Sequence, residues 1–245
     1  MNNLNRPRDR ISRTEEAGLS SAHAQLEALK TADEATYALV SLIEELEGFQ
    51  DDDSPFAKIQ QATGTICAMA YRTARACMLV IAAGYVPESF PLKRRVTEAV
   101  LLAEHIVLDI HGTRATEWLE GRKPKLGKLS AKKTDVSNIL NRYSVGSHID
   151  LRVLPREAMV DTLKGRTKGM PLSGTREPEL ANHLLLELAI ETRKLGYDFA
   201  YYVLNRDIGP DTDTRELFVK LEHELDDLVP RLYPGTVDEP VPGEE

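Results

Sequence analysis

The sequence predicts an all-α fold, a multi-helix up-down bundle in one domain. Apolar residues recur at three- and four-residue spacing along most of the chain, and helix-capping residues precede these segments. No segment alternates apolar and polar residues as a half-buried strand does. Because 42% of the 245 residues are apolar, the chain can bury a sizeable core. We expect the bundle to cover residues 20–233.

The two ends of the chain are polar. Residues 1–19 hold four arginines within a short stretch and little that could be buried, so we expect a flexible basic tail. From Pro234 onward the chain is rich in proline and acidic residues, so residues 234–245 are expected to be a disordered acidic tail.

The first predicted helix begins after Ser20 or Ser21, either of which is a good N-cap, and ends at Gly48. Residues 51–55, an acidic stretch ending in Ser-Pro, form a linker that also caps the next helix.

Two apolar helices, over 57–84 and 92–110, are expected to pack antiparallel at the centre of the bundle. The first is rich in alanine and glycine, which let neighbouring backbones approach closely, and Arg72 and Arg75 mark one polar edge of it. The second carries apolar residues in steps of three and four, which is typical of a packing seam. Only the proline-marked turn Val86–Pro91 separates them.

Shorter elements follow this pair. After Trp118 we expect an exposed basic loop over 121–125, short helices over 130–143 and 155–163, and a glycine-rich loop over 164–174. A long helix should run from Thr175 to Gly209, and a last helix from Asp213 with a leucine stripe to Leu232.

The apolar segments and cysteines predict a reduced, cytoplasmic protein that does not enter a membrane. The longest uncharged apolar run, Cys77–Val86, is about half the roughly 20 residues that span a bilayer. The arginines at the N-terminus have no apolar segment behind them, which is unlike a signal peptide. Cys67 and Cys77 on one helix would lie about 15 Å apart, too far for a disulfide.

The charge distribution is uneven. The net charge of −8 argues against general coating of nucleic acid, yet residues 114–168 hold 13 Lys and Arg against 6 Asp and Glu. This basic segment can offer an anionic ligand a local site; the alternative is a solvated loop region.

Familiar metal and nucleotide motifs are absent from the sequence. There is no CxxC, HExxH, P-loop or GxGxxG, and no Glu-x-x-His pair of the di-iron type. The i,i+4 pairs His105–Asp109 and His183–Glu187 could each supply two ligands, but such pairs are also ordinary hydrogen bonds of helix surfaces. We predict neither a metal nor another cofactor.

A structural ion pair is predicted on the second helix of the apolar pair. Arg94 and Arg95 stand four and three residues before Glu98, so either guanidinium can neutralise this carboxylate beside the packing seam. A charge near the core needs such a partner, since a lone buried charge costs several kcal/mol.

Arg142 and His148 are the candidate catalytic residues. Histidine can act as a general acid or base near neutral pH, and arginine can hold a phosphate as negative charge builds on it. The two residue types therefore suit metal-free RNA cleavage through a 2′-hydroxyl. The alternative is that Arg142 interacts with a helix C-terminus and His148 is a loop residue.

The Arg-x5-His spacing of Arg142 and His148 resembles the motif of the HEPN-like superfamily of helical proteins. A small-residue helix, then a helix bearing Arg94 or Arg95 with Glu98, then the Tyr143-Ser144…His148 segment, resemble a bacterial uncharacterised branch of it. The likeness covers about 100 of the 245 residues.

The resemblance implies a homodimer that cuts RNA without metal, in a toxin–antitoxin or phage-defence system, with an antitoxin as a further partner. It implies that Arg142 and His148 are catalytic, and with the basic loop it assigns the binding of RNA or nucleotide to Tyr143, Ser144, Lys123 and Lys125. The alternative function is a non-catalytic module for nucleotide binding, protein interaction or dimerisation, as in other HEPN-like domains.

Overall fold

The computed structural model describes residues 7–47, 54–122, 124, 178–197 and 212–232. Regular structure in these residues consists of seven α-helices, one short 3₁₀ helix and a π-helical turn at residues 195–197, and none of these residues forms a β-strand. The predicted all-α fold class is therefore confirmed for the part of the chain that is described.

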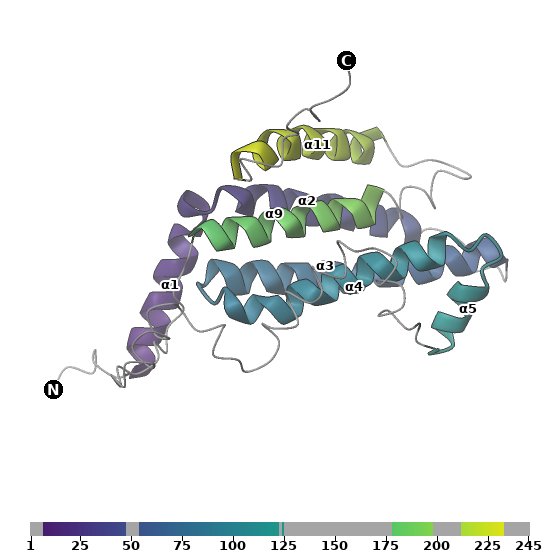
Figure 1. Cartoon of the computed structure of the whole chain (residues 1–245), viewed down its shortest axis with the longest axis horizontal. Coiled ribbons are helices and arrows are strands. Elements are labelled where there is room, and N and C mark those ends of the chain that lie inside the picture. The colour runs from purple at the N-terminus through teal and green to yellow at the C-terminus, as the bar shows by residue number, and fades with distance from the viewer. Residues whose placement is uncertain (1–6, 48–53, 123, 125–177, 198–211, 233–245) are drawn as a thin grey trace, which may run out of the picture.

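The helices form three layers (Figure 1). The middle layer contains α2 (Glu27–Glu47) and α9 (Pro178–Lys194), which pack against each other. On one side lie α3 (Pro55–Ala82) and α4 (Phe90–Val107), and on the other lies α11 (Thr212–Leu232). The predicted central position of the α3–α4 pair is thus wrong, because α2 and α9 separate this pair from α11.

Helix α1 (Pro7–Gln25) is the main departure from the predicted boundaries. Residues 7–19, expected to belong to a flexible tail, are helical and run to a break at Leu26, after which α2 begins. The helix is anchored because Ala22 and Leu26 are buried and the Tyr85 hydroxyl donates a 2.6 Å hydrogen bond to the Glu15 carboxylate. These contacts come from distant parts of the chain, which local polarity does not reveal.

The close packing of α2 on α9 depends on small side chains. Ala28, Ala32 and Ala35 of α2 are fully buried, so the two helix axes can approach closely. At the α1–α2 break, the backbone N–H of Ala28 donates a 3.1 Å hydrogen bond to Oδ1 of Asn182 in α9. The side chain of Asn182 thereby satisfies a backbone donor at a helix start, where no intrahelical partner exists.

The α3–α4 pair has the predicted boundaries within three residues. Ser54 is the N-cap of α3, accepting a 3.0 Å hydrogen bond from the backbone N–H of Ala57, and Pro55 opens the helix. A 3₁₀ turn, η2 (Pro87–Ser89), then leads into α4.

Helix α3 has one side in the core and one side exposed. Twelve of its residues are buried, among them Ile66, Ala74 and Ile81, whereas Met69 and Leu79 are each 59% exposed. Among the described helices, α3 alone is long and apolar enough to cross a membrane by length and composition, a test that the core helix of a bundle also passes.

Two further helices complete the arrangement. Helix α5 (Thr113–Leu119) caps one end of the α3–α4 pair. Helix α11 packs on α2 and α9 through Phe218, Leu221, Leu225 and Leu228, so the predicted leucine stripe is its buried side. Gly196, just after α9, lies against the Phe218 ring, where any side chain at 196 would clash.

Candidate functional site

The predicted catalytic and substrate-binding residues lie outside the described part of the chain. This applies to Arg142, His148, Tyr143 and Ser144, and to the loop lysines Lys123 and Lys125. Among the predicted site residues, Arg94, Arg95 and Glu98 fall on described structure, and they lead to a groove on the α3–α4 side of the bundle.

Glu98 pairs with Arg94 and not with Arg95. The Arg94 Nε donates a hydrogen bond of 2.9 Å to Glu98 Oε1 along one turn of α4. The two side chains keep 35% and 31% of their surface exposed, so the pair belongs to the rim of the bundle and not to its core. In such a place an ion pair contributes at most about 1 kcal/mol to stability.

Arg95 and Glu98 line a groove of about 680 Å³ at the junction of α3, α4 and α5. We call it the α3–α4–α5 groove. Its described lining consists of Ile66, Met69, Ala70, Arg72, Thr73, Arg95, Glu98, Ala99, Leu102, Trp118 and Pro124. Pockets of this size and largely apolar character commonly accept small organic ligands.

Two unpaired guanidinium groups give the groove its charge. Arg72 comes from α3 and Arg95 from α4; both are exposed, and neither forms an ion pair or a hydrogen bond in the described structure. Arginine presents several N–H donors in a planar fork that suits phosphate and carboxylate oxygens. The groove can therefore bind an anion from two sides.

Trp118 is brought to the groove by α5. The turn before α5 places Gly112 at φ +67° against Pro55, where an added Cβ would lie 2.6 Å from the Pro55 carbonyl oxygen. Ala115 is fully buried, while Trp118 packs against the core with part of its indole exposed at the groove. Only glycine fits at 112, so this residue sets the position of the aromatic wall.

Asp109 fixes the start of α5. Its carboxylate accepts a 2.7 Å hydrogen bond from the backbone N–H of Arg114 and a longer one from that of His111. These bonds, the one from Arg114 first, hold the pKa of Asp109 below its ordinary value. Partial burial, helped by the Arg114 charge, lowers the pKa of His105. Asp109, considered above as a metal ligand, is thus engaged in the turn.

Each residue of the other histidine–acid pair has a partner from another element. A ring nitrogen of His183 lies 2.8 Å from the Leu232 carbonyl oxygen, and a carboxylate oxygen of Glu187 lies 3.9 Å from the ammonium of Lys93. Within the described residues, no group of three or more His, Cys, Asp or Glu side chains is placed to hold a metal ion.

Sequence reasoning missed a buried charge network between α4 and α9. Lys93 is 0% exposed, and its ammonium lies 2.7 Å from a carboxylate oxygen of Glu191. The other oxygen of Glu191 accepts a 2.8 Å hydrogen bond from the Thr97 hydroxyl. The helical phase of Lys93, three residues before buried Val96, could have indicated its burial. The network connects two layers of the bundle.

The two cysteines are structural core residues. Both thiols are buried, and desolvation raises the pKa of Cys67 and of Cys77 to about 12. Since the nucleophile in cysteine chemistry is the thiolate, neither residue is poised for catalysis.

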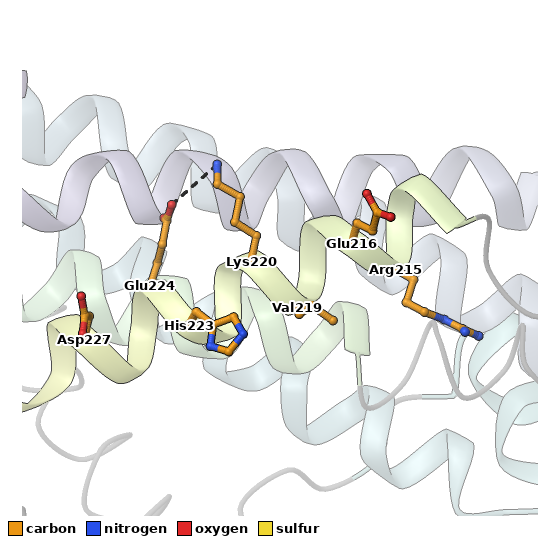
Figure 2. A pocket seen from close by; sticks show the side chains of 7 residues that line it. All are labelled: Arg215, Glu216, Val219, Lys220, His223, Glu224 and Asp227. Carbon is orange, nitrogen blue, oxygen red and sulfur yellow. Dashed lines mark ion pairs between the residues drawn. The ribbon is translucent and has the colours of Figure 1, made fainter.

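A second, shallower hollow follows the exposed side of α11 (Figure 2). It measures about 500 Å³, and its described lining consists of Arg215, Glu216, Val219, Lys220, His223, Glu224 and Asp227. Figure 2 shows Lys220 paired with Glu224, at 3.6 Å. Because its described lining carries charges of both signs and includes no Phe, Tyr or Trp, this surface matches a solvated helix face.

Glu224, on this surface of α11, interacts with the carboxyl group of Glu34 in α2. Partial burial, then the hydrogen bond and charge of Glu34, raises the pKa of Glu224. Burial also acts to raise the pKa of Glu34, but the bond with Glu224 and the ammonium groups of Lys220 and Lys30 lower it overall. The interaction between the two carboxyl groups therefore moves their pKa values apart, that of Glu224 upward and that of Glu34 downward.

No family model, curated protein or solved structure matches this chain, so the α3–α4–α5 groove is interpreted from its own residues alone.

Proposed function

We propose that this all-α protein is HEPN-like and binds a nucleotide or RNA in the α3–α4–α5 groove. One observation carries the proposal: two unpaired guanidinium groups, from Arg72 and Arg95, border an apolar groove that also contains Trp118. A nucleotide combines the two features that this lining suits, a multiply charged phosphate and a flat ring with an apolar face.

The lining can bind the phosphate through its arginines and the base through its tryptophan. Arginine forks form charge-assisted hydrogen bonds with phosphate oxygens, which are roughly twice as strong as neutral ones. An indole ring can stack on a base, a contact that contributes about 1–3 kcal/mol in nucleic-acid complexes. Ala99 and Leu102 of α4 offer an apolar floor beside it. An inorganic anion would use the arginines but not the aromatic wall.

The chain provides its own reporter for this proposal, because Trp118 is its single tryptophan. Titration with nucleoside monophosphates and a short RNA should quench the fluorescence of Trp118. Arg72→Gln and Arg95→Gln should each weaken binding about tenfold, the equivalent of roughly 1.4 kcal/mol for one lost phosphate contact. Arg215→Gln, an exposed arginine on α11 away from the groove, is the matched control.

The three variants distinguish binding in the groove from binding elsewhere. Weakening by both groove variants with an unchanged Arg215→Gln protein supports the site. Equal affinity in all three variants would remove the groove from the proposal. Binding that falls with added salt only for ligands carrying phosphate would further indicate that the guanidinium groups contact the phosphate.

RNA cleavage without metal by Arg142 and His148 is the second function we propose, as a toxin or phage-defence endoribonuclease. The sequence motif supports it, and so does chain order: Pro124, a lining residue of the groove, belongs to the basic segment 114–168 that also contains both residues. In this mechanism His148 would exchange protons with the 2′-hydroxyl or the leaving oxygen while Arg142 holds the phosphate.

Cleavage of RNA should persist in EDTA and be lost in His148→Ala and Arg142→Ala proteins that remain folded. Activity that survives in both variants, or that needs added metal, would contradict this mechanism. RNA binding without cleavage by the wild-type protein would favour the non-catalytic binding module. The homodimer that the HEPN-like proposal includes can be checked by light scattering on the same samples.

A further inference from the structure

Glu98 is placed to contact a ligand in the α3–α4–α5 groove. It is the only acidic residue in the described lining of the groove. Arg94, four residues earlier on α4, donates its Nε–H to Glu98 Oε1 at 2.9 Å, and Arg94 itself does not line the groove. The described residues supply no hydrogen bond to the other oxygen, Oε2.

The ion pair with Arg94 orients Glu98 instead of neutralising the whole groove. Arg95, although three residues before Glu98, forms no ion pair with it in the described structure. The groove therefore carries two free cationic groups, on Arg72 and Arg95, and one carboxylate with a free oxygen. A matching ligand needs oxygen acceptors at one end and N–H donors at another.

The four RNA bases differ in what they offer to a carboxylate. Guanine presents two adjacent donors, N1–H and the 2-amino group. One can bind the free Oε2 of Glu98 and the other the remaining lone pair of Oε1, because each carboxylate oxygen has two lone pairs. Adenine and cytosine each present one amino group next to a ring-nitrogen acceptor, whose lone pair repels a carboxylate. Uracil places its single N–H between two carbonyl oxygens, so a carboxylate is repelled on both sides. A fixed carboxylate thus selects guanine both by attraction and by repulsion of the others.

We propose that Glu98 selects guanine, so that the groove binds guanine nucleotides or guanosine residues of RNA. This inference rests on the proposed nucleotide-binding function. In the bound state the base stacks on Trp118, its Watson–Crick edge donates to the Glu98 carboxylate, and its phosphate lies between Arg72 and Arg95. Arg94 acts as a positioning residue, since it holds Glu98 from the side away from the ligand.

The test compares the binding of a series of nucleotides, monitored by the fluorescence of Trp118. The probes are GMP, IMP, AMP, CMP and UMP, each with the full-length protein. GMP should bind at least about tenfold more tightly than AMP, as expected when a polar site loses a matched donor. IMP keeps N1–H but lacks the 2-amino group, so its affinity should lie between those of GMP and AMP.

Glu98→Gln should weaken GMP binding at least about tenfold and leave AMP binding nearly unchanged, so that the preference disappears. Glu104→Gln, on the same helix but not lining the groove, is the control and should keep the preference. Arg94→Met retains the carboxylate but frees it, and should reduce the ratio of GMP to AMP affinity. Circular dichroism and thermal melting verify that each variant is folded.

Failure of this inference and failure of the proposed function give different results. If nucleotides bind and depend on Arg72 and Arg95 but show no guanine preference, Glu98 selection is wrong while the binding groove stands. If Glu98→Gln weakens all nucleotides equally, the residue is structural. If no nucleotide changes the fluorescence of Trp118, the proposed function itself fails. Even if a variant does not fold, the ligand series on the unmodified protein still tests nucleotide binding and the preference for guanine.

Discussion

The buried ion network of Lys93 gives the sharpest test of how the layers are joined. In the Glu191→Gln protein the ammonium of Lys93, which is 0% exposed, would lose the carboxylate 2.7 Å away, while the carboxylate of Glu187 stays 3.9 Å away. Removal of one partner from a buried pair costs about 3–5 kcal/mol, because the other charge stays desolvated. Since Glu187 still compensates in part, we expect about 3 kcal/mol.

Replacing the lysine instead of the glutamate should lower the free energy of unfolding by less. Lys93→Met removes the buried charge and leaves Glu187, whose side chain keeps 20% of its surface exposed, and Glu191, whose Oε1 still accepts the hydrogen bond from the Thr97 hydroxyl. The methionine also retains most of the apolar volume. For Lys93→Met we expect the free energy of unfolding to fall by about 1–2 kcal/mol. The double variant, Lys93→Met with Glu191→Gln, should lose less than the sum of the two single variants, with a coupling energy of about 2 kcal/mol.

Urea denaturation, followed by far-UV circular dichroism and by the fluorescence of Trp118, measures these free energies, and coincident transitions would support two-state analysis. The control is Glu179→Gln. Glu179 is exposed in the first turn of α9, the helix that also carries Glu191, and its replacement should change stability by less than about 0.5 kcal/mol. If Glu191→Gln changes stability as little as this control, or if the double variant is strictly additive, Lys93 does not depend on these carboxylates.

Three further predictions concern the α2–α11 contact, the α5 turn and the thiols. Because the pKa of Glu224 is raised in the folded protein, its contribution to stability is present at low pH and is lost as the pH rises through the folded pKa. Glu224→Gln should therefore become more stable relative to wild type as the pH rises from about 4 to 7. The pKa of Glu34 is lowered, which gives the opposite sign, so Glu34→Gln should become less stable relative to wild type over the same range; thermal melting measures both changes. Gly112→Ala should lower the melting temperature and change the emission of Trp118, because φ +67° and the neighbouring backbone exclude a side chain; an unchanged melt would contradict this. Cys67 and Cys77 should react with a thiol reagent only at the rate of unfolding, and rapid labelling of the native protein would refute their burial.

Local signals in the sequence predicted most helix boundaries. Ser54 and Pro55 marked the start of α3, and the proline-rich turn after it separated α3 from α4. The leucine stripe of α11 became its buried side, as its spacing indicates. Each of these signals depends on contacts within about one helical turn, which a sequence displays directly.

The elements that sequence reasoning missed depend on distant contacts. Helix α1 includes residues expected to be a flexible tail, and its contacts with the rest of the protein are distant in sequence: Tyr85, after α3, donates to Glu15, and Ala22 packs in the core. In the run Lys93-Arg94-Arg95, the arginines attract attention, yet the lysine is the buried cation, since its carboxylate partners come from α9.

The candidate groove was predicted only in part. Arg72 was expected on a polar edge and Arg95 beside Glu98, but nothing in their spacing predicted that both line one groove with Trp118. Their meeting with Trp118 depends on the positive φ of Gly112, a backbone property that residue spacing does not express. The assignment of Arg142 and His148 stays a prediction, because both lie outside the described residues.

The middle layer has a consequence for how the protein is made. Helix α2 packs against α9, and the hydrogen bond from Ala28 to Asn182 joins residues separated by 154 positions. During translation, α2 leaves the ribosome long before α9, so the side of α2 that packs on α9 stays exposed while residues 48–177 are synthesised. Nascent chains that stop before α9 should therefore be held by chaperones or aggregate, which makes premature termination more damaging here than in a bundle of sequential helix pairs.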